Sequence, residues 1–138
     1  MTDRHLVAVR WRDLDHLGHV YHATILTMLD EARTEWLTTK IGVEKPDSYV
    51  LARIELDYRR PLLRSDDALA VEFVPSRVGT TSVTISERAF AGASGALIAE
   101  AKTTIVLWNR PAAAPREISI FERQRLTENL EPSEGNTL

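Results

Sequence analysis

The segment Asp13-Leu-Asp-His-Leu-Gly-His-Val-Tyr-His22 lies between a strand-like run and a long helical pattern. The interpretation of the chain starts from this segment. It holds three of the chain's four histidines and two carboxylates. Gly18, in its middle, can adopt the backbone conformations of a tight turn. Titratable side chains on a turn that leads into a helix N-terminus could support acid–base or nucleophilic chemistry. The helix amides there favour negative charge, including charge that develops on a carbonyl oxygen.

The residues after this segment predict one long helix. From Ala23 to about Lys40 the apolar residues recur at spacings of three and four, which places them on one helical stripe. The stripe consists of Ile25, Met28, Leu29, Ala32 and Trp36, and the opposite face consists of Asp30, Glu31, Arg33, Thr34 and Glu35. Gly42 is a natural end for the helix. A helix with a single apolar stripe needs a sheet to cover it.

Strand-like runs supply that sheet. One precedes the helix, at Leu6 to Arg12, with Val7, Val9 and Trp11 on one face. Four follow it, at Tyr49 to Arg59, Ala68 to Val74, Thr80 to Phe90 and Ala96 to Trp108. The sequence predicts an α+β fold in which a five-stranded antiparallel sheet wraps one central helix, with the last four strands paired as a meander. Residues 1–130 are expected to form a single domain, with a short helix at Ile118 to Leu130 and a disordered tail over 131–138.

Composition excludes several classes of protein. The net charge of -3 and the pI near 5.8 argue against a nucleic-acid binder, which usually carries a basic face. The chain has no cysteine, so thiolate chemistry and disulfides are excluded. No apolar run approaches the ~20 residues of a membrane span, and the first residues lack the apolar core of a signal peptide. We therefore expect a cytoplasmic protein with no membrane insertion.

Asp15 is the leading candidate for a catalytic residue. A carboxylate near a helix N-terminus can attack an acyl carbon or deprotonate a water molecule. The structural alternative is a helix cap or turn-former, which is the common role of Asp in loops and the preferred interpretation of Asp13. His22 lies where the helix begins, and it could orient water, polarise a carbonyl or simply cap the helix. His16 and His19 are interpreted as structural or rim groups.

Two further sites are weighed from the residues alone. His16, His19 and His22 are spaced by three, as in some metal sites, but a turn at Gly18 interrupts the spacing. Every histidine lies at or before position 22, so no second cluster of ligands comes from a distant strand, and no metal is expected. The run Arg77-Val-Gly-Thr-Thr-Ser82 could bind a phosphate, or it could be a polar hairpin turn. The arginines Arg53, Arg59 and Arg60 are interpreted as a solvated sheet face or as salt-bridged pairs.

These motifs resemble a known family. Asp13-x-Asp15-x-x-Gly18-His19-Val20-Tyr21-His22-Ala23, with Glu31-Ala-Arg-Thr-Glu35 in the following helix, is similar to the signature of hotdog-fold acyl-CoA thioesterases. Within them it resembles the 4-hydroxybenzoyl-CoA thioesterase group, in its Tol–Pal-associated branch, which the Tyr21-His22 pair favours. The likeness runs from about Val7 to Trp108 and includes Glu55-Leu-Asp-Tyr58 before Pro61. His16-Leu17 and Trp11-Arg12 depart from the usual pattern.

The resemblance implies an acyl-CoA thioesterase that releases a carboxylic acid and free CoA. Asp15 would be the catalytic nucleophile or general base, and His22 would assist it. Substrate contacts are expected from His19, Tyr21, Ala23, Thr24, Arg77, Gly79, Thr80 and Ser82. No cofactor is needed. Unpaired sheet edges predict a homodimer or homotetramer, and the family places its active sites between two copies. The alternatives are a non-catalytic acyl-CoA or acyl-carrier-protein binding module and a metal-dependent hydrolase.

Overall fold

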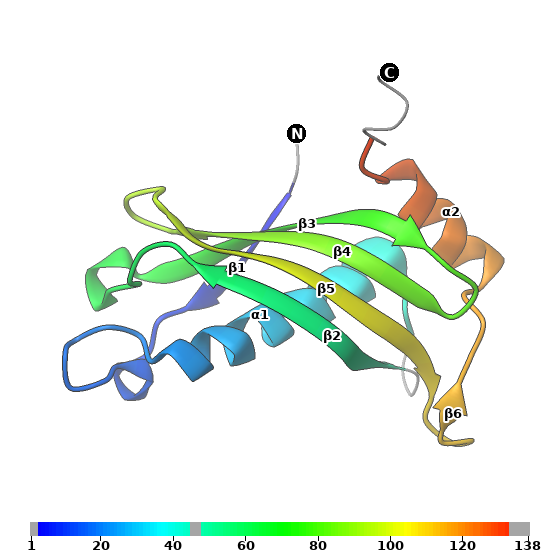
Figure 1. Cartoon of the computed structure of the whole chain (residues 1–138), viewed down its shortest axis with the longest axis horizontal. Helices are drawn as coiled ribbons and strands as arrows, with labels where there is room; N and C mark the ends of the chain where they lie inside the picture. The colour runs from blue at the N-terminus through cyan, green and yellow to red at the C-terminus, as the bar shows by residue number, and fades with distance from the viewer. Residues whose placement is uncertain (1–2, 45–47, 133–138) are drawn as a thin grey trace. The chain divides into compact units, whose positions relative to one another are not determined.

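The structure is a computed structural model that describes residues 3–44 and 48–132 (Figure 1). The chain divides into two compact units, which are described separately. Unit 1 comprises Met1–Trp36, Leu56–Phe73 and Glu87–Ala101, and unit 2 comprises Leu37–Glu55, Val74–Ser86 and Lys102–Leu138. Most of the predicted disordered tail lies outside the described residues. Its described start, Glu131, donates its N–H to the Pro75 carbonyl at 2.7 Å.

The described strands form a six-stranded sheet in the order β1-β3-β4-β5-β2, with β6 paired to β5. They are β1 (Arg4–Ala8), β2 (Ser48–Tyr58), β3 (Ala68–Val78), β4 (Ser82–Ala91), β5 (Leu97–Asn109) and β6 (Ala114–Pro115). Residues 91–95 form the hairpin loop between β4 and β5, in which the Ala91 N–H donates to the Ala96 carbonyl and Gly95 has a positive φ of 76°. The two-residue β6 lies between the last predicted strand and the predicted C-terminal helix.

The predicted four-strand meander is wrong, because β2 lies beside β5 rather than beside β3. The connection over residues 59–67 is too long for a hairpin turn. It begins with the Arg59 and Arg60 N–H groups donating to the Ile98 carbonyl, at 2.7 and 3.2 Å, and continues through the buried Leu62. The β3 edge that β2 would have needed is taken by β1, which pairs with it antiparallel from Arg4↔Glu72 to Ala8↔Ala68. Only β3, β4 and β5 therefore follow one another in the sheet.

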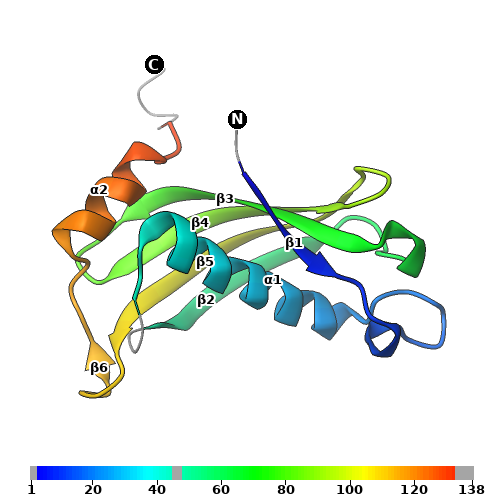
Figure 2. The same ribbon diagram turned by 180° about the vertical axis from the view of Figure 1, so that it is seen from behind.

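In unit 1, α1 (His22–Trp36) lies against one face of the strands (Figure 2). The predicted apolar stripe is confirmed, since all five of its residues are buried. The Trp36 ring stacks on Phe73 of β3, with ring centroids 5.4 Å apart. Arg33 was predicted on the solvent face, and this is wrong. Arg33 is 1% exposed, and its side chain forms a two-point ion pair with the equally buried Glu87 of β4, at 2.6 and 2.8 Å.

The first strand is shorter at its C-terminal end than predicted. It ends at Ala8, and Trp11–Asp13 form a 3-10 turn in which the Trp11 side chain is 74% exposed. The cause is Asp13, whose carboxylate accepts from the backbone N–H and the guanidinium of Arg10 and so bends the chain. The prediction that Asp13 forms a turn is thereby confirmed, and Trp11 does not share a buried face with Val7.

In unit 2, a π-helical turn, Leu37–Ile41, follows α1. Gly42, with a φ of +90°, ends this turn. The Gly42 N–H returns to the Leu37 carbonyl at 2.8 Å, so the predicted stop is confirmed. The short C-terminal helix is present as α2 (Ile120–Glu128). It begins two residues later than predicted because Ser119 caps it, accepting from Glu122 N–H at 3.1 Å. Among the described residues, none of the helices combines the length and apolar character that a membrane span requires.

Candidate active site

Backbone hydrogen bonds fix the loop between β1 and α1, which belongs to unit 1. The Val20 N–H donates to the Leu62 carbonyl and the Tyr21 N–H donates to the Asp13 carbonyl, each at 2.8 Å. Gly18 has a φ of +80°, so this turn needs a residue that tolerates the left-handed region. These hydrogen bonds therefore hold the residues between Asp13 and His22 in a fixed conformation before the helix.

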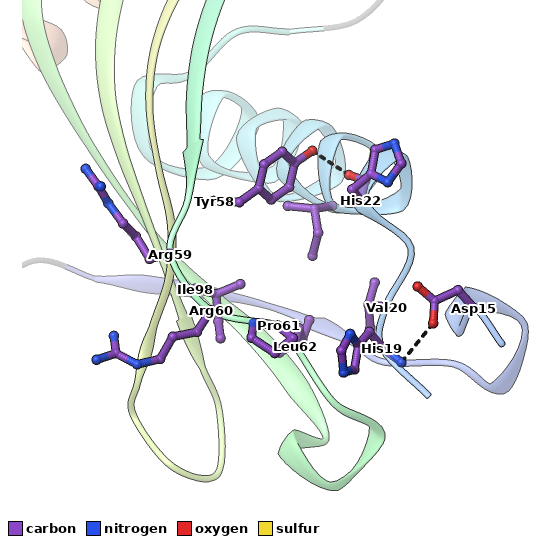
Figure 3. A pocket seen from close by; sticks show the side chains of 11 residues that line it. Asp15, His19, Val20, His22, Tyr58, Arg59, Arg60, Pro61, Leu62 and Ile98 are labelled. Carbon is purple, nitrogen blue, oxygen red and sulfur yellow. Dashed lines mark hydrogen bonds between the residues drawn. The ribbon is translucent and has the colours of Figure 1, made fainter. Parts of the chain in front are cut away.

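Asp15 organises this loop with only one of its carboxylate oxygens. Its Oδ1 accepts the N–H groups of Leu17, at 2.9 Å, and His19, at 3.1 Å. Its Oδ2 has no hydrogen-bond partner among the described residues, and in Figure 3 it turns away from the loop amide. Partial desolvation pushes the Asp15 pKa up, but the two backbone hydrogen bonds and the nearby His19 and His16 outweigh it and lower the pKa below its ordinary value. Asp15 is therefore a carboxylate at neutral pH, with one oxygen available.

His22 is the first residue of α1, and its ring is exposed. The ring packs against Tyr21, with centroids 4.3 Å apart, and lies edge-on to Tyr58 at 6.3 Å. Among the described residues no hydrogen bond joins His22 to Asp15. The N–H groups of His22 and Ala23 also have no acceptor within the described part of the chain, as expected for the first turn of a helix. These two amides are free to donate to a ligand at this helix end.

Asp15, His19 and His22 lie around one cavity of about 360 Å³, here called the Asp15 cavity (Figure 3). Its apolar lining comes from Val20, Ile25, Pro61, Leu62 and Ile98, and its remaining polar lining comes from Tyr58, Arg59 and Arg60. An apolar pocket with a few converging polar groups is the usual form of a small-molecule site. A carboxylate, an imidazole and a helix N-terminus meet here beside an apolar floor, which suits chemistry on an acyl group.

Of the four substrate contacts predicted near the helix, one lines the Asp15 cavity and three do not. His19 lines the Asp15 cavity, whereas Tyr21, Ala23 and Thr24 are not among the residues that line it. Thr24 donates its N–H to the Tyr21 carbonyl at 2.8 Å, so that amide is already engaged. Of the amides between Tyr21 and Thr24, the structure thus leaves those of His22 and Ala23 for a substrate.

The predicted phosphate-binding run belongs to unit 2. Gly79 donates its N–H to the Ser82 carbonyl at 2.7 Å, and a Cβ on Gly79 would come within 2.8 Å of the Ser82 hydroxyl. Gly79, Thr80 and Ser82 thus form a tight turn between β3 and β4. Arg77 instead lines a second cavity, of about 330 Å³, with Arg53, Glu55, Ser76, Thr84, Lys102 and Thr104. These side chains are called the Arg77 cluster.

Tyr58, Arg59 and Arg60 line the Asp15 cavity, and sequence reasoning did not assign them to the site. Arg59 was interpreted as part of a solvated sheet face or of a salt-bridged pair, and its contact with Glu100 at 3.1 Å favours the second interpretation. A usable signal was present in the sequence, because a strand that stops before Pro61 places its last residues at one end of the sheet. What the sequence could not reveal is that this end of β2 returns to the start of α1.

A metal site is not apparent in the described part of the chain. Within residues 3–44 and 48–132, no group of three or more histidine, aspartate and glutamate side chains is arranged to hold a metal ion. His16 is exposed, and His19 and His22 take part in the separate contacts described above.

Comparison with known proteins gives a consistent result. The model of the thioesterase-like superfamily matches residues 9–125. The chain is 28% identical over 121 residues to the acyl-CoA thioester hydrolase YbgC of Escherichia coli, covering 81% of this chain and 89% of the relative.

Solved structures agree in fold. A thioesterase from Thermus thermophilus, complexed with coenzyme A and Zn, superimposes with a TM-score of 0.75 at 29% identity, covering 94% of this chain and 96% of the other. A thioesterase-superfamily protein from Jannaschia superimposes with a TM-score of 0.84 at 19% identity, covering 95% and 94%. The family match spans the Asp15 loop, α1 and the strands β2 to β6. The chain therefore belongs to the thioesterase-like superfamily, and it is a thioester hydrolase with the α+β hotdog fold.

Proposed function

We propose that this protein hydrolyses acyl-CoA thioesters to a carboxylic acid and free CoA, using Asp15. The observation that carries the proposal is the free Oδ2 of Asp15 on a cavity that also receives the N-terminus of α1. The Escherichia coli relative is an acyl-CoA thioester hydrolase, and the Thermus structure contains coenzyme A, which supports the choice of substrate.

The free amides of His22 and Ala23 would donate hydrogen bonds to the thioester oxygen as it gains negative charge. Asp15 then has two possible roles. As a nucleophile, its oxygen forms a bond to the acyl carbon, the C–S bond breaks, and water later hydrolyses the mixed anhydride. As a general base, it takes a proton from water as the water attacks, and that proton passes to the departing thiolate. His22 would orient the attacking group in either case.

An acyl-CoA panel tests the proposal directly. Steady-state hydrolysis should be measured for short, long and aromatic acyl-CoA substrates, beside equilibrium binding of the same compounds. Turnover of at least one of them supports the enzyme. Binding without turnover across the panel would instead favour the non-catalytic acyl-CoA or acyl-carrier-protein binding module. The panel would also identify the acyl group, which the apolar lining of the Asp15 cavity does not specify.

The Arg77 cluster supports a phosphate-binding role in unit 2. Within the described residues, neither Arg77 nor Lys102 has an ion-pair partner, whereas Arg53 pairs with Glu55. The Thr84 and Thr104 hydroxyls share one hydrogen bond of 3.3 Å, which leaves one of their two protons to donate outward. In a chain with a net charge of -3, this excess of donors suits a phosphate group. We therefore propose that the phosphates of CoA bind here, with Arg77 as one contact.

Arg77→Ala is expected to raise KM for CoA thioesters by about tenfold while changing kcat little, since it removes binding that is equal in ground and transition states. A pantetheine thioester lacks the nucleotide and should lose almost nothing. Arg110→Ala, which removes another exposed arginine of unit 2, is the charge-matched control. Equal KM changes for the long and the truncated substrate would show that Arg77 does not contact the nucleotide end.

Assembly is proposed from the sheet edge. The strand β2 ends the sheet order, and its apolar residues Val50 and Leu51 are 39% and 48% exposed. An unpaired apolar edge favours association, and two-fold pairing with a second copy would cover it. The family resemblance implies the same and places each active site between two copies. We propose a homodimer, with a homotetramer built from such dimers as the alternative.

Activity should therefore fall together with dimer content on dilution. Light scattering and the hydrolysis assay are run side by side over a concentration series, and specific activity is expected to follow the dimer fraction. A monomer with full specific activity would contradict both the shared site and the proposed assembly.

Cytoplasmic location and membership of the Tol–Pal-associated branch remain predictions from the sequence.

A further inference from the structure

Tyr58 makes a specific contact with the first residue of α1. Tyr58 is the last residue of β2, and its hydroxyl donates a 2.6 Å hydrogen bond to the backbone carbonyl of His22 (Figure 3). Its ring also lies edge-on to the His22 ring, with an interplanar angle of 88°. Both residues line the Asp15 cavity. The contact thus joins the end of a strand to the helix turn that borders the cavity.

The His22 carbonyl belongs to the same peptide group as the Ala23 N–H. A hydrogen bond accepted at the carbonyl oxygen draws electron density from the amide and makes its N–H a stronger donor. The Ala23 N–H has no acceptor among the described residues and lies in the first helical turn. Tyr58 therefore acts on a peptide whose N–H is free to donate, and its short hydrogen bond also fixes the plane of that peptide.

We propose that Tyr58 is a positioning residue for thioester hydrolysis, which holds and polarises the His22–Ala23 peptide so that the Ala23 N–H donates to the reacting carbonyl oxygen. The inference rests on the proposed function of the Asp15 cavity. It adds Tyr58, a residue of β2, to the groups that stabilise negative charge at the N-terminus of α1. Tyr58 does not touch the substrate in this role, since its hydroxyl proton is directed to the His22 carbonyl.

The phenol must keep its proton to serve as this donor. Desolvation by burial raises the pKa of Tyr58 above its ordinary value, which keeps the donor form present over the neutral range. The titratable and charged groups that face it around the cavity are His22 of α1, Asp15 and His19 of the loop, and Arg59 and Arg60 that follow β2. Loss of the phenol proton at high pH would remove the hydrogen bond to the His22 carbonyl.

Tyr58→Phe deletes the hydroxyl and keeps the ring. It is expected to lower kcat by about tenfold with little change in KM, the effect of losing one hydrogen bond made stronger in the transition state. Circular dichroism and thermal unfolding confirm that the variant is folded. Near-wild-type kcat in a folded Tyr58→Phe protein would overturn the inference.

A second experiment separates this role from a merely structural one. Replacing Tyr58 alone with 3,5-difluorotyrosine lowers the phenol pKa with little change in shape. The fall of kcat at alkaline pH should then move to lower pH than in the wild type, after correction for uncatalysed hydrolysis. The same amino acid placed at Tyr49, earlier in β2, should leave the profile unchanged. An alkaline profile that does not move with fluorination at position 58 would also overturn the inference.

These outcomes remain distinct from failure of the proposed function. If the wild-type protein hydrolyses no member of the acyl-CoA panel, then the proposed function fails, and with it the reaction that Tyr58 is said to assist. If the wild type is active and Asp15→Asn is not, the proposed function stands. In that case, only the two Tyr58 experiments decide whether the strand contributes through the His22 carbonyl.

Discussion

Asp15→Asn is expected to lower kcat by about 100-fold or more, which is the range for losing a general base or an attacking carboxylate. Asparagine keeps the shape and one oxygen, so it can still accept the N–H groups of Leu17 and His19 that hold the loop. What disappears is the charge and the nucleophilic oxygen at Oδ2. Steady-state hydrolysis, with the unfolding midpoint measured on the same sample, tests the assignment.

Asp13→Asn is the matched control, because it makes the same chemical change two residues away. Asp13 is 4% exposed, and both of its carboxylate oxygens accept hydrogen bonds from Arg10. Its replacement should therefore reduce stability more than turnover, the reverse of the pattern for Asp15. A folded Asp15→Asn protein with near-wild-type turnover would remove Asp15 from the mechanism.

The two roles left for Asp15 can be tested by a single turnover in H₂¹⁸O with enzyme in excess. If Asp15 is the nucleophile and water attacks the Asp15 carbon of the mixed anhydride, the first product acid carries an unlabelled oxygen from the carboxylate, and the label enters the enzyme. Label in the product alone arises from general-base catalysis or from attack of water on the acyl carbon of the anhydride, and trapping of the anhydride with hydroxylamine separates these two cases.

The features predicted well from the sequence are those set by local residue patterns. The stripe from Ile25 to Trp36 has the period of a helix, and all of its members are buried. Gly42 and Gly95 adopt positive φ at the ends of elements, where glycine is favoured. Asp15 and His22 were named from the same short segment, and both line one cavity, while their catalytic roles stay predictions. Each of these predictions needed only a short window of sequence.

The features that were missed depend on contacts between distant segments. The place of β2 beside β5 depends on which strand occupies the β3 edge, and periodicity within a strand carries no such information. Tyr58 could be assigned to a strand, but not to the His22 carbonyl, which lies 36 residues earlier in the chain. Arg33 was assigned to the solvent face because it is charged, and its partner Glu87 lies 54 residues away.

Glu87→Ala is expected to lower the free energy of unfolding by about 3–5 kcal/mol, because it leaves the buried Arg33 guanidinium without its main counter-charge. Glu87 contributes both of its oxygens to Arg33, and the side chains of Arg33 and Glu87 are 2% and 0% exposed. Urea unfolding at fixed protein concentration measures the loss. Asp30→Asn is the control: Asp30 contacts the same guanidinium at 3.2 Å, but its side chain is 62% exposed, so its loss should cost at most about 1 kcal/mol.

The double variant Arg33→Met/Glu87→Leu shows what the ion pair itself contributes. Removing one partner exposes the desolvation cost of the other, whereas replacing both with apolar side chains of similar size removes that cost. The double variant should therefore recover most of the stability that Glu87→Ala loses. Its turnover should stay near that of the wild type, since neither residue lines the Asp15 cavity. A double variant as unstable as Glu87→Ala would mean that the ion pair fixes the packing of α1 on β4 in a way that apolar contacts do not replace.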